Sequence, residues 1–210
     1  MTFEILKPFG PPIYKAMLSD DMIAFFKQVA TATKAGTYNV GLTLAGNIDK
    51  QYAVVMDTEQ TVIFHNEVKR HVHRALEEFD RKYDPNSTFD IDKLEYHHGK
   101  GPWINFQKAG EFNPIHNHTG ALSAVLYIDI PECIAEENKQ TYFSNAPSAG
   151  MISWIFGGAV DMLGTDYHYT HQPATGELFI FPAALQHAVY PYKSDVERIS
   201  MSFNVHDIKF

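Results

Sequence analysis

The sequence has almost no cysteine and no long apolar run. Cys133 is the only cysteine among 210 residues, which excludes an intrachain disulfide framework. No stretch approaches the roughly 18 apolar residues needed to span a bilayer, and prolines interrupt the N-terminal segment where a secretory leader would need an apolar run. We therefore expect a cytoplasmic chain with no membrane partner.

Basic charge is also scarce. The formal net charge is −8, and the acidic residues are scattered along the chain instead of forming blocks. Binding to nucleic acid usually needs a basic patch or stripe, so we expect no nucleic-acid partner. A small acidic ligand is compatible with this composition, because a local basic pocket can exist in a chain of negative average charge.

Aromatic residues are abundant. Fifteen Phe and eleven Tyr occur mostly in short runs with Thr, Ile and Val, which favours a β-rich core. The proline-containing segment 2–17 is expected to be an extended edge segment. Apolar residues then recur every three or four positions, predicting helices near 20–34 and 61–83 with a loop at 42–51 between them.

From about residue 89 the apolar period changes to two. The strand-like segments are WINFQ, ALSAVLYIDIP, TYFSN, MISWIF, DYHYTHQ, GELFIFP, HAVYPY and RISMSFNV. Residues 132–140 are interpreted as an exposed acidic loop. The pattern predicts a mainly β fold with flanking α-helices, a double-stranded β-helix (jelly roll) with the helices packed outside. We expect one domain over 1–210, helical over 1–88 and with its jelly-roll core over 89–210.

Three histidines are candidates for a metal site. His116 and His118 stand two apart in NPIHNHTG, so on a strand they would share a face, as metal ligands or simply as surface residues. His187 follows a buried strand much later in the chain. Together the three imidazoles would form a facial triad that leaves positions open on the metal. His71 and His73 are also two apart, but on a predicted helix, where such residues do not share a face, so both are expected to face solvent.

Arg198 and Ser200 share a face of the strand in ERISMSFNV. If this strand lies antiparallel to the one bearing His187, Arg198 points into the same barrel interior. A guanidinium there is costly unless it binds an anion, and it would bind a carboxylate bidentately, with the Ser200 hydroxyl as a further donor. The alternative is a surface ion pair with Glu197 or Asp195.

At these residues the sequence resembles the 2-oxoglutarate- and iron(II)-dependent oxygenase superfamily, and most closely a small bacterial and viral branch similar to prolyl hydroxylases. The matching stretches are WINFQKAGEFNPIHNHTGALSAVLYIDIP and GELFIFPAALQHAVYPY through RISMSFN. The resemblance implies a dioxygenase that uses O2 and hydroxylates a peptidyl, prolyl-like substrate or a small molecule. It also implies two cofactors: Fe(II) held by the catalytic residues His116, His118 and His187, and 2-oxoglutarate bound by Arg198, Ser200 and Tyr127.

The sequence departs from the superfamily pattern at His118, where Asp or Glu is usual. A third neutral ligand leaves the ion with more positive charge, which should alter oxygen activation. Glu111 or an anionic ligand could supply the missing charge. Segments 36–52 and 132–150 are expected to form the substrate pocket, because loops at a barrel mouth usually set specificity. Trp103, Asn105 and Asn204 are further candidates for its lining.

Two other classes of protein share some of these features. A cupin is also a double-stranded barrel and often binds a metal through three histidines. Its first motif needs a Glu where this chain has Leu122 and Ser123, and it gives Arg198 no reason to point inward. The second class is a non-catalytic module with a closed zinc site, but such sites are usually rich in cysteine.

Overall fold

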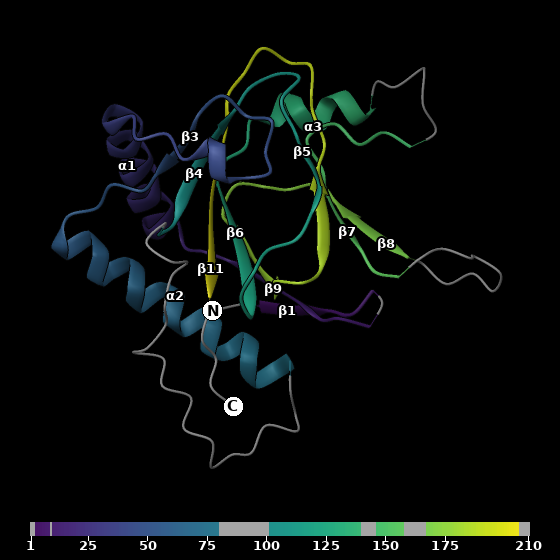
Figure 1. Cartoon of the computed structure of the whole chain (residues 1–210), viewed down its shortest axis with the longest axis horizontal. Coiled ribbons are helices and arrows are strands. Elements are labelled where there is room, and N and C mark those ends of the chain that lie inside the picture. The colour runs from purple at the N-terminus through teal and green to yellow at the C-terminus, as the bar shows by residue number, and fades with distance from the viewer. Residues whose placement is uncertain (1–2, 9, 80–100, 140–145, 158–166, 206–210) are drawn as a thin grey trace.

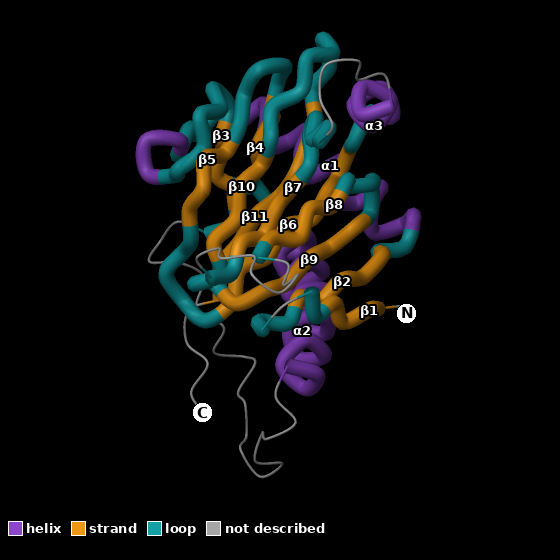
Figure 2. The backbone as a smooth tube through the Cα atoms, turned by 90° about the vertical axis from the view of Figure 1, so that its right-hand side faces the viewer, coloured by secondary structure: helices purple, strands orange, loops and turns teal. Residues whose placement is uncertain are grey.

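The fold is mainly β, a jelly roll of two antiparallel sheets. The computed structural model describes residues 3–8, 10–79, 101–139, 146–157 and 167–205. The larger sheet has the order β1 (Phe3–Leu6), β2 (Ile13–Met17), β9 (Glu177–Pro182), β6 (Leu122–Asp129), β11 (Arg198–Val205), β4 (Trp103–Gln107) and β3 (Gln51–Ala53). The smaller sheet has the order β5 (Asn113–His116), β10 (Gln186–Val189), β7 (Ile152–Ile155) and β8 (His168–His171), as Figures 1 and 2 show. The predicted TYFSN strand lies outside the described residues.

Two helices cover the outer face of the larger sheet (Figure 1). They are α1 (Asp20–Gly36) and α2 (Thr58–Phe79), close to the helices predicted from the apolar spacing. Ser19 caps the first turn of α1, since its Oγ accepts a hydrogen bond from the Met22 N–H at 3.4 Å. The helix ends at Gly36, and the capping residue Thr37 takes a left-handed conformation with φ 55°. A short 3-10 turn, η1 (Gly41–Thr43), lies in the predicted loop that follows.

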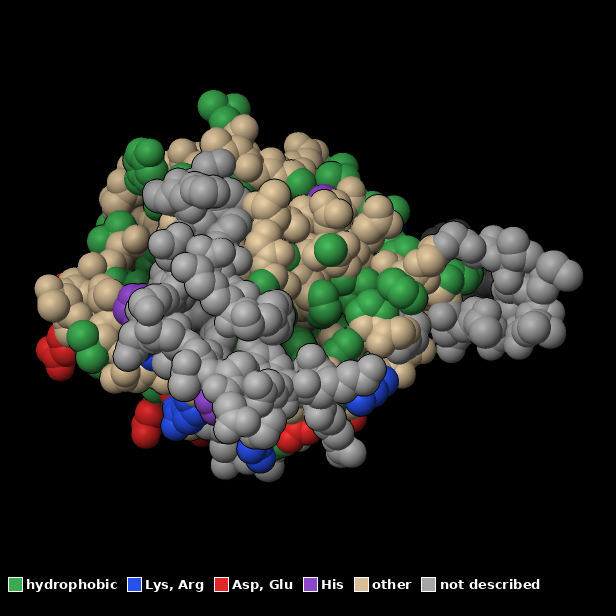
Figure 3. All heavy atoms as spheres, turned by 60° about the horizontal axis from the view of Figure 1, so that its bottom comes forward, with side chains coloured by type: hydrophobic (Ala, Val, Ile, Leu, Met, Phe, Trp, Pro, Cys, Tyr) green, Lys and Arg blue, Asp and Glu red, His purple; other side chains and the backbone are tan. Residues whose placement is uncertain are grey.

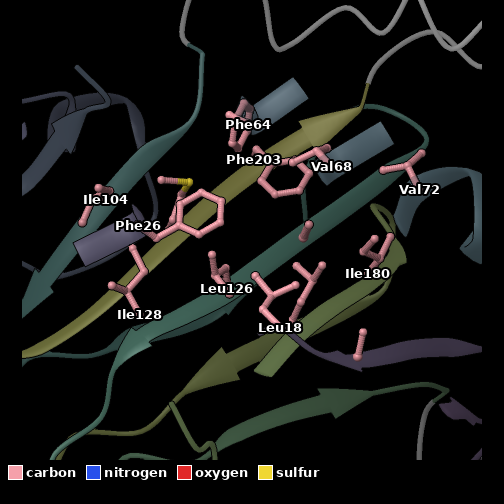
Figure 4. Close-up of a cluster of buried hydrophobic side chains, with 14 of the residues drawn as sticks. Leu18, Phe26, Phe64, Val68, Val72, Ile104, Leu126, Ile128, Ile180 and Phe203 are labelled. Atoms are coloured by element: carbon pink, nitrogen blue, oxygen red, sulfur yellow. The ribbon is translucent and has the colours of Figure 1, made fainter. Parts of the chain in front are cut away.

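Alternation along the strands divides their side chains between two apolar layers. Between the helices and the larger sheet, Phe26 and Phe64 pack at an edge-to-face angle, and Phe64 packs in the same way on Phe203 (Figure 4). The second layer lies between the two sheets, where Trp154 contacts the rings of Phe179 and Phe181. The rest of the space between the sheets forms the pocket described below.

Part of the organisation differs from the expectation. The N-terminal part, predicted to be helical apart from its edge segment, also supplies β3 at the far edge of the larger sheet. Strands from both parts pair in this one sheet, which supports a single domain over 1–210. We keep that domain as a proposal. The acidic segment predicted to be a loop is a helix, α3 (Glu132–Lys139). Ile134 is fully buried, and the Glu137 carboxylate accepts the backbone N–H of Ser194 at 2.7 Å, so tertiary contacts hold this helix in place.

The face of the molecule drawn in Figure 3 carries mixed charge. On the face drawn in Figure 3, side chains of Lys and Arg lie among those of Asp and Glu along the lower margin. The absence of a nucleic-acid partner stays a prediction. Among the described helices, none is long and apolar enough to cross a membrane.

Candidate metal centre

The structure brings the three predicted histidines together. One ligand nitrogen from each of His116, His118 and His187 lies within 4.8 Å of the others, and the described residues contain no other such group of three or more potential metal ligands. His116 ends β5 and pairs directly with His187 of β10. His118 lies just beyond β5, so the two nearby histidines do not share one strand as expected. The His118 N–H donates to the Ala183 carbonyl at 2.9 Å, which holds its backbone against the turn between β9 and β10.

Backbone carbonyls define which nitrogen of two histidines can bind a metal. The Nδ1 of His116 lies 2.7 Å from the Pro114 carbonyl, and the Nδ1 of His187 lies 3.0 Å from the Leu185 carbonyl. A carbonyl only accepts, so each Nδ1 carries the proton and each Nε2 keeps its lone pair. Burial lowers the pKa of His187 to about 3, and burial also lowers the pKa of His116. Both rings are therefore neutral near pH 7, the form that binds metal.

The pocket consists of two chambers that meet at the histidines. The inner chamber is narrow, about 40 Å³, and the outer one is about 260 Å³. Residues that line both are Leu44, Ala45, Trp103, His116 and His118, whereas Arg198, Ser200 and Tyr127 line the inner chamber alone. The structure therefore places the predicted cofactor-binding residues on one side of the triad and a wider opening on the other.

Arg198 is a buried cation that has no acidic partner among the described residues. It is 3% exposed, and its Nη1 donates to the Gly150 carbonyl at 2.6 Å. The alternative of a surface ion pair is wrong, because Glu197 pairs with Lys34 instead. Burial lowers the pKa of the guanidinium, yet Arg stays protonated in proteins. Arg198 reaches the chamber from β11, which pairs with β4 and β6, so the expected pairing with the His187 strand is also wrong.

Several buried polar atoms in the inner chamber have no hydrogen-bond partner in the part of the chain that the structure describes. They include the Tyr127 hydroxyl and the Arg198 Nε, and also side-chain amide oxygens of Gln51, Gln107 and Asn113. Buried polar atoms are usually hydrogen-bonded, so such a concentration indicates a polar ligand. Burial also raises the pKa of Tyr127, whose hydroxyl stays protonated and able to donate.

An amide-lined wall beside Arg198 was only partly anticipated. Asn105 was a candidate lining residue, but Gln107 was not, although both share a face of WINFQ at a spacing of two. Arg198 and Gln107 are direct partners in the register of β11 and β4. Gly46 lies against this wall, since a Cβ there would approach Asn113 Oδ1 to 2.1 Å. A glycine is therefore needed for the 36–52 segment to pack this closely.

Only some of the segments and residues predicted to form the substrate pocket line the two chambers. Segment 36–52 lines both chambers, and Trp103 and Asn204 line the outer one. The described part of 132–150 lines neither. Glu111 supplies no charge to the histidines, because its carboxylate accepts the backbone N–H groups of Asp49 and Lys108.

The expectation that His71 faces solvent is wrong. The residue is 1% exposed, and its ring bridges a strand and a helix. Its Nδ1 accepts from the Tyr14 hydroxyl at 2.8 Å, and its Nε2 lies 3.2 Å from the Glu67 carboxylate. Helical spacing alone did not reveal that β2 covers this part of α2.

A jelly roll with an open facial metal centre and a buried arginine is typical of 2-oxoglutarate-dependent oxygenases, although their usual third ligand is a carboxylate where this chain has His118. A family model described as "Putative 2OG-Fe(II) oxygenase" matches residues 101–204, the segment that contains the triad and Arg198. The chain belongs to this family of Fe(II)- and 2-oxoglutarate-dependent oxygenases, and the cupin alternative is set aside. The comparison with curated proteins gave no match.

Solved structures share the fold at low sequence identity. A crystal structure of a prolyl-4-hydroxylase from Pseudomonas putida is 15% identical, with a TM-score of 0.57 over 93% of this chain and 92% of that one. A prolyl hydroxylase from Trichoplax adhaerens, in complex with a hypoxia inducible factor oxygen degradation domain peptide fragment, is 10% identical. Its TM-score is 0.54 over 98% of this chain and 83% of that chain. At these identities the likeness concerns the fold alone.

Proposed function

We propose that this chain is an Fe(II)- and 2-oxoglutarate-dependent dioxygenase that hydroxylates a peptidyl, prolyl-like target or a small molecule. The observation that carries the proposal is the pairing of an open triad of imidazoles with a buried guanidinium across one narrow chamber, whose described lining contains no Asp or Glu. A molecule with a chelating 2-oxo acid at one end and a carboxylate at the other matches both ends of that chamber.

Each residue has a defined role in this proposal. His116, His118 and His187 hold the iron, and Arg198 binds the far carboxylate of 2-oxoglutarate with its guanidinium fork. Ser200 and the Tyr127 hydroxyl donate further hydrogen bonds to the same end. Bound iron would activate O2, which is the oxidant: one of its oxygen atoms would end in succinate as 2-oxoglutarate loses CO2, and the other would enter a substrate C–H bond to give the alcohol.

The apolar parts of the outer chamber would exclude water and hold the carbon to be hydroxylated. Val40, Leu44, Ala45 and Trp103 form those parts. A peptidyl target is supported by the Trichoplax adhaerens enzyme, which shares the fold and is bound to a peptide fragment in its structure. A small molecule fits a chamber of about 260 Å³ equally well.

The test is thermal stabilisation by 2-oxoglutarate, with Mn(II) as a redox-silent substitute for iron. The wild type should be stabilised by Mn(II) and further by 2-oxoglutarate. Arg198→Ala should lose the second effect but keep the first, because removing one partner of a buried charge pair typically costs about 2–5 kcal/mol, roughly thirty-fold or more in affinity. Arg198→Lys should retain part of the effect, since lysine has the charge without the fork.

Two results would contradict the proposal. One is a wild type that 2-oxoglutarate does not stabilise, and the other is an Arg198→Ala variant that it stabilises equally. Turnover is then tested with Fe(II) and O2 by measuring the succinate released with peptide and metabolite libraries.

A further inference from the structure

The two chambers contain positive charge that no described side chain neutralises. Among the described residues that line them, none is Asp or Glu. A divalent ion held by three neutral imidazoles would keep both of its charges, and Arg198 adds a third. The superfamily pattern has a carboxylate at the position of His118, so this chain has one negative charge fewer at its metal centre.

Binding of 2-oxoglutarate does not complete the charge balance. The co-substrate carries two negative charges, which leaves one positive charge in a largely buried space. Charge interactions over about 5 Å are strong there, because protein surrounds the chamber and screens less than water does. A cationic group beside the metal is therefore disfavoured, and an anionic group is favoured.

The outer chamber has a suitable hydrogen-bond donor beside its apolar parts. Asn204 is 2% exposed, and its Oδ1 accepts a hydrogen bond from the Ser123 Oγ at 2.7 Å. This contact uses the oxygen of the amide, so its N–H groups are the part that can donate to a ligand. A ligand that fits has an anionic group on a small apolar body.

We propose that the substrate of this enzyme carries a carboxylate close to the carbon that is hydroxylated, and that this carboxylate binds in the outer chamber beside the metal and Asn204. The inference rests on the proposed function and narrows its substrate class. A peptide would satisfy it with a terminal carboxylate or an acidic side chain, and a small molecule with a carboxylic acid group.

The experiment measures anion binding with Co(II) in place of iron, under saturating 2-oxoglutarate so that Arg198 is occupied. Acetate and acetamide are the probes, because they have nearly the same shape and differ in charge. Visible absorption of Co(II) reports their binding. Acetate should change the spectrum with an affinity at least about tenfold higher than that of acetamide.

Two variants test the origin of the preference. His118→Asp adds one negative charge at the centre and should weaken acetate binding by about tenfold or more. Gln28→Glu adds the same charge at an exposed position of α1, on the outer side of the larger sheet, and should leave acetate binding unchanged.

The outcomes separate this inference from the proposed function. Equal affinities for acetate and acetamide, or unchanged acetate binding in His118→Asp, would overturn the carboxylate assignment while the 2-oxoglutarate result stands. Chloride binding without acetate binding would overturn it as well, because the site would then be one for a small inorganic anion. Failure to bind Co(II) and 2-oxoglutarate would overturn both proposals.

Discussion

The two faces of the larger sheet are built from the same strands but have opposite properties. Along β11, Met201 and Phe203 are buried against the helices, whereas Arg198, Ser200 and Ser202 line the inner chamber. The outer face is tightly packed and apolar. The inner face contains buried polar atoms without partners, which cost stability until a ligand binds them. We infer that the outer face supplies most of the stability, which allows the inner face to be built for binding.

The largest expected effect on the free energy of unfolding comes from removing a buried side chain from the outer face of the larger sheet. Phe203→Ala removes a ring that is 1% exposed and packs on Phe64, so the free energy of unfolding should fall by about 3–5 kcal/mol. Ser202→Ala, the next position on the same strand but on the inner face, should change it by less than about 1 kcal/mol. Urea unfolding of both variants without ligand measures the difference. Similar losses in the two variants would contradict this division between the faces.

His71, a buried polar residue between α2 and the outer face of the larger sheet, should make the stability of the protein depend on pH. Burial lowers the pKa of His71 to about 4, so between pH 6.5 and 4 the unfolded chain binds more protons at this site than the folded chain. Stability should therefore be lost as the pH falls through this range, by roughly 3 kcal/mol from His71 alone. His71→Gln can keep bonds to Tyr14 and Glu67 but does not titrate. Melting temperatures between pH 7 and 4 should fall less in this variant, and an identical slope would exclude His71 as the cause.

The smallest expected effect is on ligand affinity at the inner face of the larger sheet and comes from removing the Tyr127 hydroxyl. The Tyr127 hydroxyl has no protein partner, so Tyr127→Phe should leave the stability of the ligand-free protein within about 1 kcal/mol of the wild type. Its affinity for 2-oxoglutarate should nevertheless fall by about fivefold, the effect of losing one hydrogen bond. Calorimetric titration with Mn(II) present measures that affinity. An unchanged value would show that the hydroxyl does not contact the co-substrate.

Local periodicity allowed much of this molecule to be predicted. A period of two in RISMSFNV placed Arg198 and Ser200 on one face, and the apolar spacing located α1 and α2, because side-chain direction follows from the geometry of each element. The same local reasoning failed for α3 and for His71. Both depend on contacts with distant segments, Ser194 in one case and Tyr14 in the other.

The sequence by itself determined the kinds of ligand groups present: three imidazoles, a guanidinium and no carboxylate at His118. Tertiary structure decided how they meet. His116 and His187 are joined by pairing of β5 with β10, whereas Arg198 comes from the opposite sheet. Such pairings join residues far apart in the chain and depend on how two whole sheets pack, which no local period encodes. Likewise, only the tertiary structure shows that none of the described residues lining the two chambers is acidic, the observation that underlies the proposed carboxylate substrate.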